Sequence, residues 1–357
     1  MKIKNLKRSV ALTEGGFQLK TELQPSLQYA LYLHTPEKLH KRYYKSEGEW
    51  VFSENVVLGK FYTADFYYKC GSDIEKHRLV FYVDKLSKEV VVIEGCSIVE
   101  TSDYKIDYYN RGSDITFVVF NGYGSTKNSE PFGLNFLLGL GFNVVACLQN
   151  NNQYQGLSFT DFKDYVGSYV VNKRVFLYGS SLGGYCAVYY AGAVNGTVIA
   201  AAPKNSAHPG LVKNEKFKNL KFTHSEIFDN PITDKPVFIL IDNLYKSDVN
   251  FIEKFVLPAY PNLYLLPFKN AGHAVLYHVN KTKQLKNIIL NIVYNKPIVI
   301  DSGIESVYTD LTQARNFLSK KMYADFELYV EKILSSNDLN DNILNQVKDM
   351  VDKSRNI

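Results

Sequence analysis

The sequence predicts an α/β protein: a mostly parallel sheet with flanking helices, preceded by a small β-rich domain and followed by a helical segment. Short strand-like segments separated by turn residues occupy residues 1–105. Fully apolar runs then alternate with helical segments over residues 106–300. Beyond that point apolar residues recur at helical spacing. We therefore predict three parts, 1–105, 106–300 and 301–357.

The N-terminal part is predicted to be a sandwich-like arrangement of short antiparallel strands. Its strand-like segments are rich in Tyr, Val, Phe and Ile, and several alternate polar with apolar residues. The predicted strands are Gln28–His34, Trp50–Phe52, Gly59–Tyr68, Arg78–Val83 and Val90–Glu94. We interpret the aromatic side chains, Trp50 included, as cross-strand packing, with carbohydrate stacking as the alternative.

The central part is predicted to contain a parallel sheet that is buried on both faces. Its apolar runs are continuous rather than alternating, which is typical of strands covered by helices on both sides. The predicted strands are Ile115–Phe120, Asn143–Leu148, Val175–Tyr178, Val198–Ala202, Val237–Ile241 and Leu263–Pro267. A helix is predicted over Pro131–Leu140, and further helical segments separate the later strands.

The C-terminal part is predicted to be helical because apolar residues recur at steps of three and four. The residues of this pattern are Leu311, Ala314, Leu318 and Met322, then Phe326, Val330 and Ile333, and finally Ile343, Leu344, Val347, Met350 and Val351. We expect the apolar stripe to pack on the protein's own sheet. A dimer contact is the alternative, so the oligomeric state stays open.

Composition narrows the class of protein. The net charge of +5 is small for 357 residues, and no basic run is interleaved with aromatics, so we expect no nucleic-acid binding. The four cysteines are far apart and form no CxxC pair, so we expect no metal site and no disulfide framework. No stretch approaches the roughly 18 apolar residues of a membrane span. We expect a soluble, cytoplasmic protein without a transmembrane segment.

The strongest motif is GSSLG at Gly179–Gly183, a GxSxG pattern between an apolar strand and an apolar helix-like segment. This strand–turn–helix context is what a nucleophile elbow requires. Side chains at Gly179 or Gly183 would collide with the neighbouring strand and helix. A phosphate-binding Walker loop would need Lys followed by Ser or Thr after the last glycine, where GY stands instead. We therefore predict Ser181 as a nucleophile.

The predicted base is His273. It follows the predicted strand Leu263–Pro267 and precedes a helix-like segment, which places it in the chain order nucleophile, acid, histidine. A neutral imidazole there can take the serine proton and later return it. The other six of the seven histidines lie in the N-terminal part, before the acid candidates, or on the helical side of His273.

Two residues are candidates for the acid that orients this imidazole. Asp242 ends the predicted strand Val237–Ile241, and Asp248 begins a helix-like segment over 248–255. An N-cap is the alternative role for Asp248, since aspartate commonly caps helices. We favour Asp248 and keep Asp242 as the alternative acid.

An oxyanion hole is predicted from two backbone amides. The amide of Leu182 follows the nucleophile at a helix N-terminus, where the dipole favours developing negative charge. The second donor is expected in the loop after the first central strand, Asn121–Ser125, at the amide of Tyr123 or Gly122.

The stretch from Phe117 to Val279 resembles the α/β-hydrolase superfamily. Within it, three runs resemble serine enzymes of bacterial surface-polysaccharide synthesis, among them capsular polysaccharide O-acetyltransferases of this fold. These runs are YGSSLGGY at 178–185, VIAAAP at 198–203 and PFKNAGH at 267–273. The resemblance assigns the nucleophile to Ser181 and the base to His273. Because the family's acid follows a strand-ending glycine, whose place Asp242 takes here, the resemblance leaves the choice between Asp242 and Asp248 open.

The resemblance implies acetyl-CoA as acyl donor and co-substrate, a sugar hydroxyl as acceptor, and no bound cofactor. The predicted function is therefore acetyl transfer to a carbohydrate or polysaccharide through an acyl-enzyme, in surface or capsule polysaccharide biosynthesis. The first alternative is an esterase, in which water instead of a sugar resolves the same acyl-enzyme. The second is a non-catalytic carbohydrate-binding or assembly protein, against which the complete set of Ser, Asp and His argues.

Overall fold

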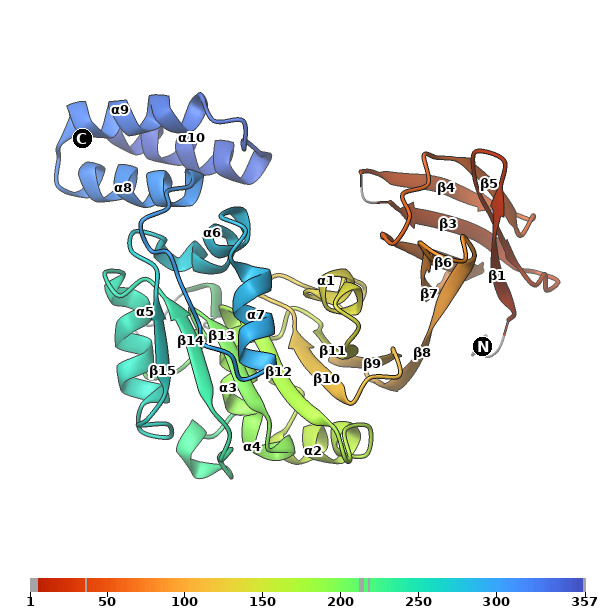
Figure 1. The fold of residues 1–357 in the computed structure, drawn as a ribbon, viewed down its shortest axis with the longest axis horizontal. Coiled ribbons are helices and arrows are strands. Elements are labelled where there is room, and N and C mark those ends of the chain that lie inside the picture. The colour runs from red at the N-terminus through yellow and green to blue at the C-terminus, as the bar shows by residue number, and fades with distance from the viewer. Residues whose placement is uncertain (1–5, 36, 212–214, 218, 356–357) are drawn as a thin grey trace.

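The computed structural model describes residues 6–35, 37–211, 215–217 and 219–355. Their strands form a 12-stranded sheet in the order β15-β14-β13-β12-β10-β11-β9-β8-β7-β6-β3-β4 and a 3-stranded sheet in the order β1-β2-β5. Figure 1 shows the helix-covered part of the large sheet at the centre, the N-terminal strands to its right and the C-terminal helices above it. In the described residues no helix is long and apolar enough to cross a membrane.

The predicted parallel sheet is present. Its six parallel strands are β10 (Ile115–Phe120), β11 (Asn143–Gln149), β12 (Arg174–Ser180), β13 (Thr197–Ala201), β14 (Val237–Ile241) and β15 (Tyr264–Pro267). Val118 and Phe120 of β10 enter one hydrophobic core, and Phe117 and Val119 enter another on the opposite face. Both faces are therefore buried, which explains why the strand sequences are continuously apolar.

Helices cover the two faces of this sheet. The helices on the face of Phe120 are α2 (Phe159–Gly167), α3 (Leu182–Tyr189), α4 (Ala191–Val194) and α5 (Lys246–Phe251). Those on the face of Phe117 are α1 (Leu134–Gly139), α6 (Val275–Lys281) and α7 (Leu285–Val293). Short turns of helix are η1 (Glu215–Phe217), η2 (Ile227–Asp229), η3 (Ile252–Val256) and η4 (Gly272–Ala274). The predicted helix Pro131–Leu140 begins only at Leu134, because Gly133 before it has a left-handed φ of 65°.

The N-terminal strands form the expected sandwich-like pair of layers. One layer is β1 (Arg8–Thr13), β2 (Gly16–Thr21) and β5 (Glu49–Ser53), and the other is β3 (Gln28–His34), β4 (Leu39–Lys45), β6 (Phe61–Cys70) and β7 (Asp73–Val83). Phe17 and Trp50 from the first layer share a core with Leu31, Tyr62 and Phe81 from the second. Trp50 is 3% exposed, so its side chain packs between strands as the first interpretation held and is not available to stack on a carbohydrate.

Two antiparallel strands join this sandwich to the parallel sheet. In β8 (Val90–Glu100), residues Val90–Ile93 pair with β7, and the remainder pairs with β9 (Tyr104–Asn110). Strand β9 in turn pairs antiparallel with β11. One layer of the sandwich is therefore a continuation of the central sheet, and residue 105, the predicted end of the first part, lies inside β9.

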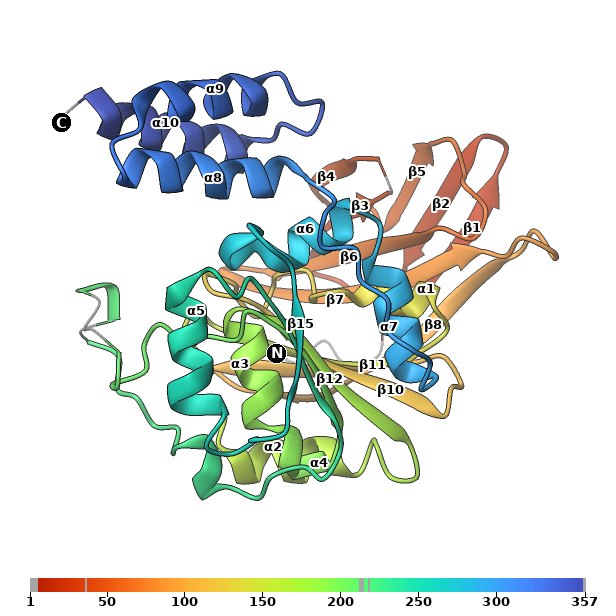
Figure 2. The same ribbon diagram turned by 60° about the vertical axis from the view of Figure 1, so that its left-hand side comes forward.

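The C-terminal helices are α8 (Val307–Ser319), α9 (Tyr323–Leu334) and α10 (Asp341–Arg355). Their apolar stripes form a core of their own, in which Leu311, Phe326 and Ile343 meet. These helices thus pack on one another, and the expectation that their apolar stripes pack on the sheet is wrong. Figure 2 shows α8 next to α6, and an added Cβ at Gly272 in η4 would lie 2.6 Å from Thr312 Oγ1 of α8.

Candidate active site

Ser181 lies on a sharp turn between strand β12 and helix α3. Its φ of 54° and ψ of −118° are unusual for a residue with a side chain, and such a conformation costs on the order of 1–3 kcal/mol. The surrounding backbone fixes it: its amide donates to the Ala201 carbonyl at 2.9 Å, and its carbonyl accepts from the Lys204 amide at 3.0 Å. A strained strand-to-helix turn of this kind is what a nucleophile elbow requires.

The glycines of the motif are required by close packing. A Cβ added at Gly179 would lie 2.2 Å from the Gly183 carbonyl oxygen, and one added at Gly183 would lie 2.2 Å from the Phe120 carbonyl oxygen. Both neighbours are backbone atoms that cannot rotate away. Helix α3 can therefore approach β12 and the end of β10 closely only because these two positions lack side chains.

The structure brings Ser181, His273 and Asp248 together. Nε2 of His273 lies 2.8 Å from Ser181 Oγ, and Nδ1 lies 2.7 Å from Asp248 Oδ2. A carboxylate can only accept a hydrogen bond, so Nδ1 carries the proton and Nε2 presents its lone pair to the serine hydroxyl. This geometry suits proton removal from Ser181 Oγ. Asp248 is 1% exposed, whereas the His273 side chain is 38% exposed.

Asp242, the alternative acid, has different partners. Its Oδ1 accepts a hydrogen bond from the Leu244 amide at 3.0 Å, and its Oδ2 accepts one from the Gly272 amide at 2.8 Å. Asp242 thus connects the end of β14 to the loop that carries His273. Neither of the hydrogen bonds of the imidazole goes to Asp242.

A lysine that the sequence analysis did not select lies beside the acid. Lys204 Nζ is 3.8 Å from Oδ1 of Asp248, the oxygen that has no hydrogen-bond partner among the described residues. The same ammonium group donates to Ser247 Oγ at 2.6 Å. The backbone amide of Lys204 also donates to the Ser181 carbonyl, so Lys204 connects the turn at Ser181 to Asp248. The sequence feature that could have identified Lys204 is its position directly after VIAAAP, at the carboxyl edge of the sheet.

The predicted oxyanion donors lie on either side of the close contact between helix α3 and the end of strand β10. Leu182 begins α3, and Gly183 packs under the carbonyl of Phe120, directly before the loop with Gly122 and Tyr123. The Gly122 carbonyl accepts hydrogen bonds from Ser125 Oγ at 2.7 Å and from Gln149 Nε2 at 3.1 Å. Because the Gly122 carbonyl and the Tyr123 amide share one planar peptide, these bonds also fix the direction of that amide.

The surroundings of the site come from several segments. The Tyr245 ring is centred 6.4 Å from the His273 ring, and burial, followed by the charge of Asp248, raises the pKa of Tyr245. Tyr123 is 57% exposed and meets Phe217 edge to face at 5.7 Å.

Among the described residues no group of three or more His, Cys, Asp or Glu side chains is arranged to hold a metal ion.

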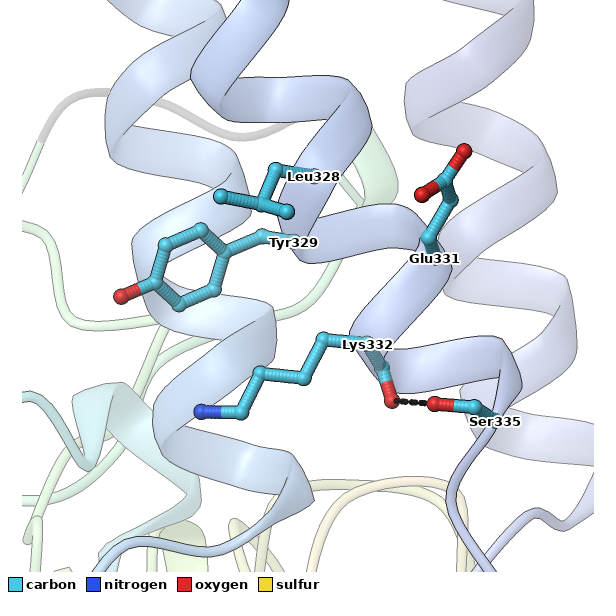
Figure 3. Close-up of a pocket in the computed structure, with 5 residues that line it drawn as sticks. All are labelled: Leu328, Tyr329, Glu331, Lys332 and Ser335. Atoms are coloured by element: carbon cyan, nitrogen blue, oxygen red, sulfur yellow. Dashed lines mark hydrogen bonds between the residues drawn. The ribbon is translucent and has the colours of Figure 1, made fainter.

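A separate hollow of about 520 Å³ lies on helix α9 (Figure 3). Its lining residues are Leu328, Tyr329, Glu331, Lys332 and Ser335. Four of the five belong to α9 and Ser335 directly follows it, and Lys332 already pairs with Glu305 and Asp310 at 2.7 Å each. The hollow contains none of the residues around Ser181.

Comparisons with known proteins give a fold-level likeness. The capsule O-acetyltransferase of Neisseria meningitidis serogroup A is 13% identical, with 56% of this chain and 95% of that chain covered and a TM-score of 0.42. A dienelactone hydrolase from Anabaena variabilis is 14% identical over 54% of this chain and 94% of its own, with a TM-score of 0.35. An α/β serine hydrolase without a lid from Xanthomonas campestris is 14% identical over 58% and 97%, with a TM-score of 0.36. Comparison with protein families and with curated proteins gives no match.

Proposed function

We propose that the chain is a serine enzyme that transfers an acyl group to a carbohydrate hydroxyl through an acyl-enzyme on Ser181. One observation most supports acyl-enzyme chemistry on Ser181: the hydrogen-bonded series Ser181–His273–Asp248 stands on a strained turn that the surrounding backbone holds in place. Strain of this kind needs compensation from the rest of the fold, and a scaffold without chemistry has no use for it.

In the first half-reaction, Ser181 Oγ attacks the acyl carbon of a thioester donor, acetyl-CoA, and its proton passes to Nε2 of His273. The tetrahedral oxyanion is stabilised by the amides of Leu182 and Tyr123, with Gly122 as the alternative to Tyr123. When the intermediate collapses, the carbon–sulfur bond breaks and the leaving thiolate takes the proton from Nε2. Asp248 holds the imidazole in orientation and stabilises its positive charge during this step.

In the second half-reaction, a sugar hydroxyl attacks the acyl carbon while His273 accepts its proton, and Ser181 Oγ leaves with that proton. Hydrolysis follows the same path with water as the nucleophile. Water is present at roughly 55 M, but a well-oriented bound hydroxyl reaches effective molarities of about 10⁵ M or more, so acceptor binding decides between the two outcomes. The β-sandwich and the three C-terminal helices are additions to the helix-covered sheet, and a bare esterase needs neither.

The nature of the acceptor follows from the three sequence runs that resemble enzymes of bacterial surface-polysaccharide synthesis. We place the reaction in the modification of such a polysaccharide, of which a capsule is one form. The partial exposure of His273 instead favours an esterase, because water can reach the imidazole that would activate it.

A covalent probe tests the nucleophile, and an acceptor test decides the reaction. A fluorophosphonate should label the wild-type chain, and Ser181→Ala should abolish labelling; labelling that persists in this variant places the nucleophile elsewhere. Thiol release from acetyl-CoA should be slow alone and much faster with a polysaccharide acceptor, with the acetyl group recovered on the sugar. If acetate is released rapidly and no carbohydrate changes its rate of release, the transferase is excluded and the protein is an esterase.

A further inference from the structure

Strands β3, β4 and β6 have a second face, opposite the sandwich core, that the proposed chemistry does not use. Because side chains alternate along a strand, Leu31 and Phe66 enter the core while their neighbours point outward. We call the outward set the Tyr–Lys face and define it as Tyr32, Lys41, Tyr43, Tyr67 and Lys69. Figure 1 shows these strands beyond the edge of the helix-covered part of the sheet, on the side of α1.

Three tyrosine rings form a row across this face. The Tyr32 ring is centred 6.5 Å from that of Tyr43 and 4.8 Å from that of Tyr67. Tyr43 is 72% exposed, so its ring is accessible to a ligand. The negative faces of aromatic rings attract the polarised C–H groups on the flat side of a sugar ring, so a row of rings offers successive stacking positions.

Two lysines of this face, Lys41 and Lys69, form no ion pair with a carboxylate among the described residues. Lys41 Nζ lies 5.5 Å from the centre of the Tyr32 ring, and Lys69 Nζ lies 5.5 Å from that of Tyr44. Their charges are therefore available to an anionic ligand.

The one carboxylate that these three strands place on this face is already neutralised. Asp65 accepts hydrogen bonds from Arg78 at 2.7 and 2.9 Å, and Lys76 and His34 lie within 3.1 Å of it. Burial acts to raise the pKa of Asp65, but the hydrogen bonds from His34 and Arg78 outweigh it and hold this pKa well below its usual value. Asp65 thus adds no free negative charge that would repel an anion.

Strand β7, which pairs with β6 beside this face, contacts the loop that follows β10. Arg78 Nη2 pairs with Glu130 at 2.9 Å, and Lys76 Nζ donates to the Asn128 carbonyl at 2.9 Å. Both partners belong to the loop that leaves β10 at Phe120, where Gly183 of the elbow packs. Because Lys76 Nζ also lies 5.7 Å from the centre of the Tyr67 ring, a long ligand could extend from the Tyr–Lys face across Lys76 toward this loop.

We propose that the Tyr–Lys face binds the acceptor chain and that this acceptor is an anionic glycan, bearing phosphate or carboxylate groups. The tyrosine row stacks on its sugar rings, and Lys41 and Lys69 pair with its charges. This inference rests on the proposed function, because it names the acceptor of that same site.

Binding to the full-length Ser181→Ala chain tests the proposal without turnover. The probes are oligogalacturonate, a phosphodiester-linked sugar oligomer and a neutral malto-oligosaccharide of equal length. We expect an anionic oligomer to bind at least tenfold more tightly than the neutral one, with affinity falling as salt rises. The carboxylate and phosphate arms identify which anion is preferred. Equal affinity for all three probes, or no binding of any, overturns the proposal.

Two variants locate the binding on this face. Lys41→Gln with Lys69→Gln should weaken anionic binding about tenfold at low salt, since each exposed pair contributes a factor of a few. Tyr43→Ala should weaken binding by a similar factor and Tyr43→Phe should retain it, because stacking needs the ring and not the hydroxyl. Their folding is checked by circular dichroism and thermal melting.

The matched control removes the same charge from two exposed lysines elsewhere, Lys286→Gln with Lys348→Gln. If the control weakens binding as much as the Lys41 and Lys69 pair, the effect is one of net charge and the proposal fails. Fluorophosphonate labelling of the wild-type chain is measured in parallel. Labelled protein without glycan binding contradicts this inference alone, whereas unlabelled protein contradicts the proposed function.

Discussion

The carboxylate of Asp242 accepts a hydrogen bond from the amide of Gly272 at 2.8 Å, one residue before His273, yet it leaves the imidazole to Asp248. The two buried acids therefore have separate tasks. Asp248 orients the ring directly, and Asp242 holds the backbone from which the ring projects. Both contacts hold the imidazole relative to Ser181, but only Asp248 contacts the ring itself.

Asparagine at each acid separates these tasks. Asp248→Asn should lower kcat/KM on the order of a thousandfold or more with the fold intact, because the amide favours the wrong imidazole tautomer. Asp242→Asn should lower kcat/KM less, and it should reduce the free energy of unfolding because a buried acceptor for the Leu244 and Gly272 amides is weakened. p-Nitrophenyl acetate turnover and urea denaturation measure both. The opposite order of rates would make Asp242 the acid of the site.

Lys204 should contribute through Asp248. Its ammonium lies 3.8 Å from a buried carboxylate oxygen that has no hydrogen-bond partner in the described chain, so removing it leaves that charge less compensated. Lys204→Met should lower kcat/KM by about tenfold, well short of Asp248→Asn, and Lys204→Arg should restore most of it. The kinetics are compared at equal low salt. An unchanged rate in Lys204→Met would exclude this role.

Gly272 should be intolerant of substitution for two reasons that can be separated. Its φ is +59°, which costs a residue with a Cβ about 1–2 kcal/mol, and that Cβ would lie 2.6 Å from Thr312 Oγ1. Gly272→Ala should therefore lower both stability and activity, because the strain moves the neighbouring His273.

The double variant Gly272→Ala with Thr312→Ala isolates the clash. Removing Oγ1 should recover part of the lost activity and leave the cost of the backbone conformation, with Thr312→Ala alone as the control. Additive losses in the double variant would show that α8 does not press on this loop.

The sequence was most informative where local packing imposes strict requirements. The parallel strands were predictable because burial on both faces demands continuous apolar runs. The turn at Ser181 was predictable because a Cβ added at Gly179 or at Gly183 would lie 2.2 Å from a backbone atom, so both positions require glycine. The choice of Asp248 as the acid agrees with its hydrogen bond to His273; its catalytic role remains a prediction.

The features that could not be predicted from the sequence depend on contacts between distant segments. Nothing local indicates that β8 pairs with β7 at one end and with β9 at the other, which makes one sandwich layer part of the central sheet. Lys204 likewise cannot be distinguished from the other lysines in the sequence. Its role depends on Asp248, which follows 44 positions later in the chain and lies beside it in the fold. The apolar stripes predicted the C-terminal helices correctly. They do not indicate whether these helices pack on the sheet or on each other.

Acid should destabilise the fold through His224, a histidine outside the proposed chemistry. It is 8% exposed and lies within 3.1 Å of the Tyr185 hydroxyl and 3.0 Å of the Tyr154 carbonyl. Burial lowers the pKa of His224 to about 4. An unfolded chain has a histidine pKa of about 6.5, so it binds this proton more readily than the folded chain between those values.

The sign follows from this difference in proton binding. The contribution of His224 is fully present above about pH 6.5, declines as the pH falls, and is lost below about pH 4, a change on the order of 3 kcal/mol. Urea denaturation at pH 7.5, 6 and 5 should therefore show falling stability, and His224→Gln should show a shallower fall from a lower starting value. His208 and His278, whose pKa values burial also lowers, remain in both proteins and supply the same residual slope. Equal slopes in the two proteins would show that His224 does not titrate in this window.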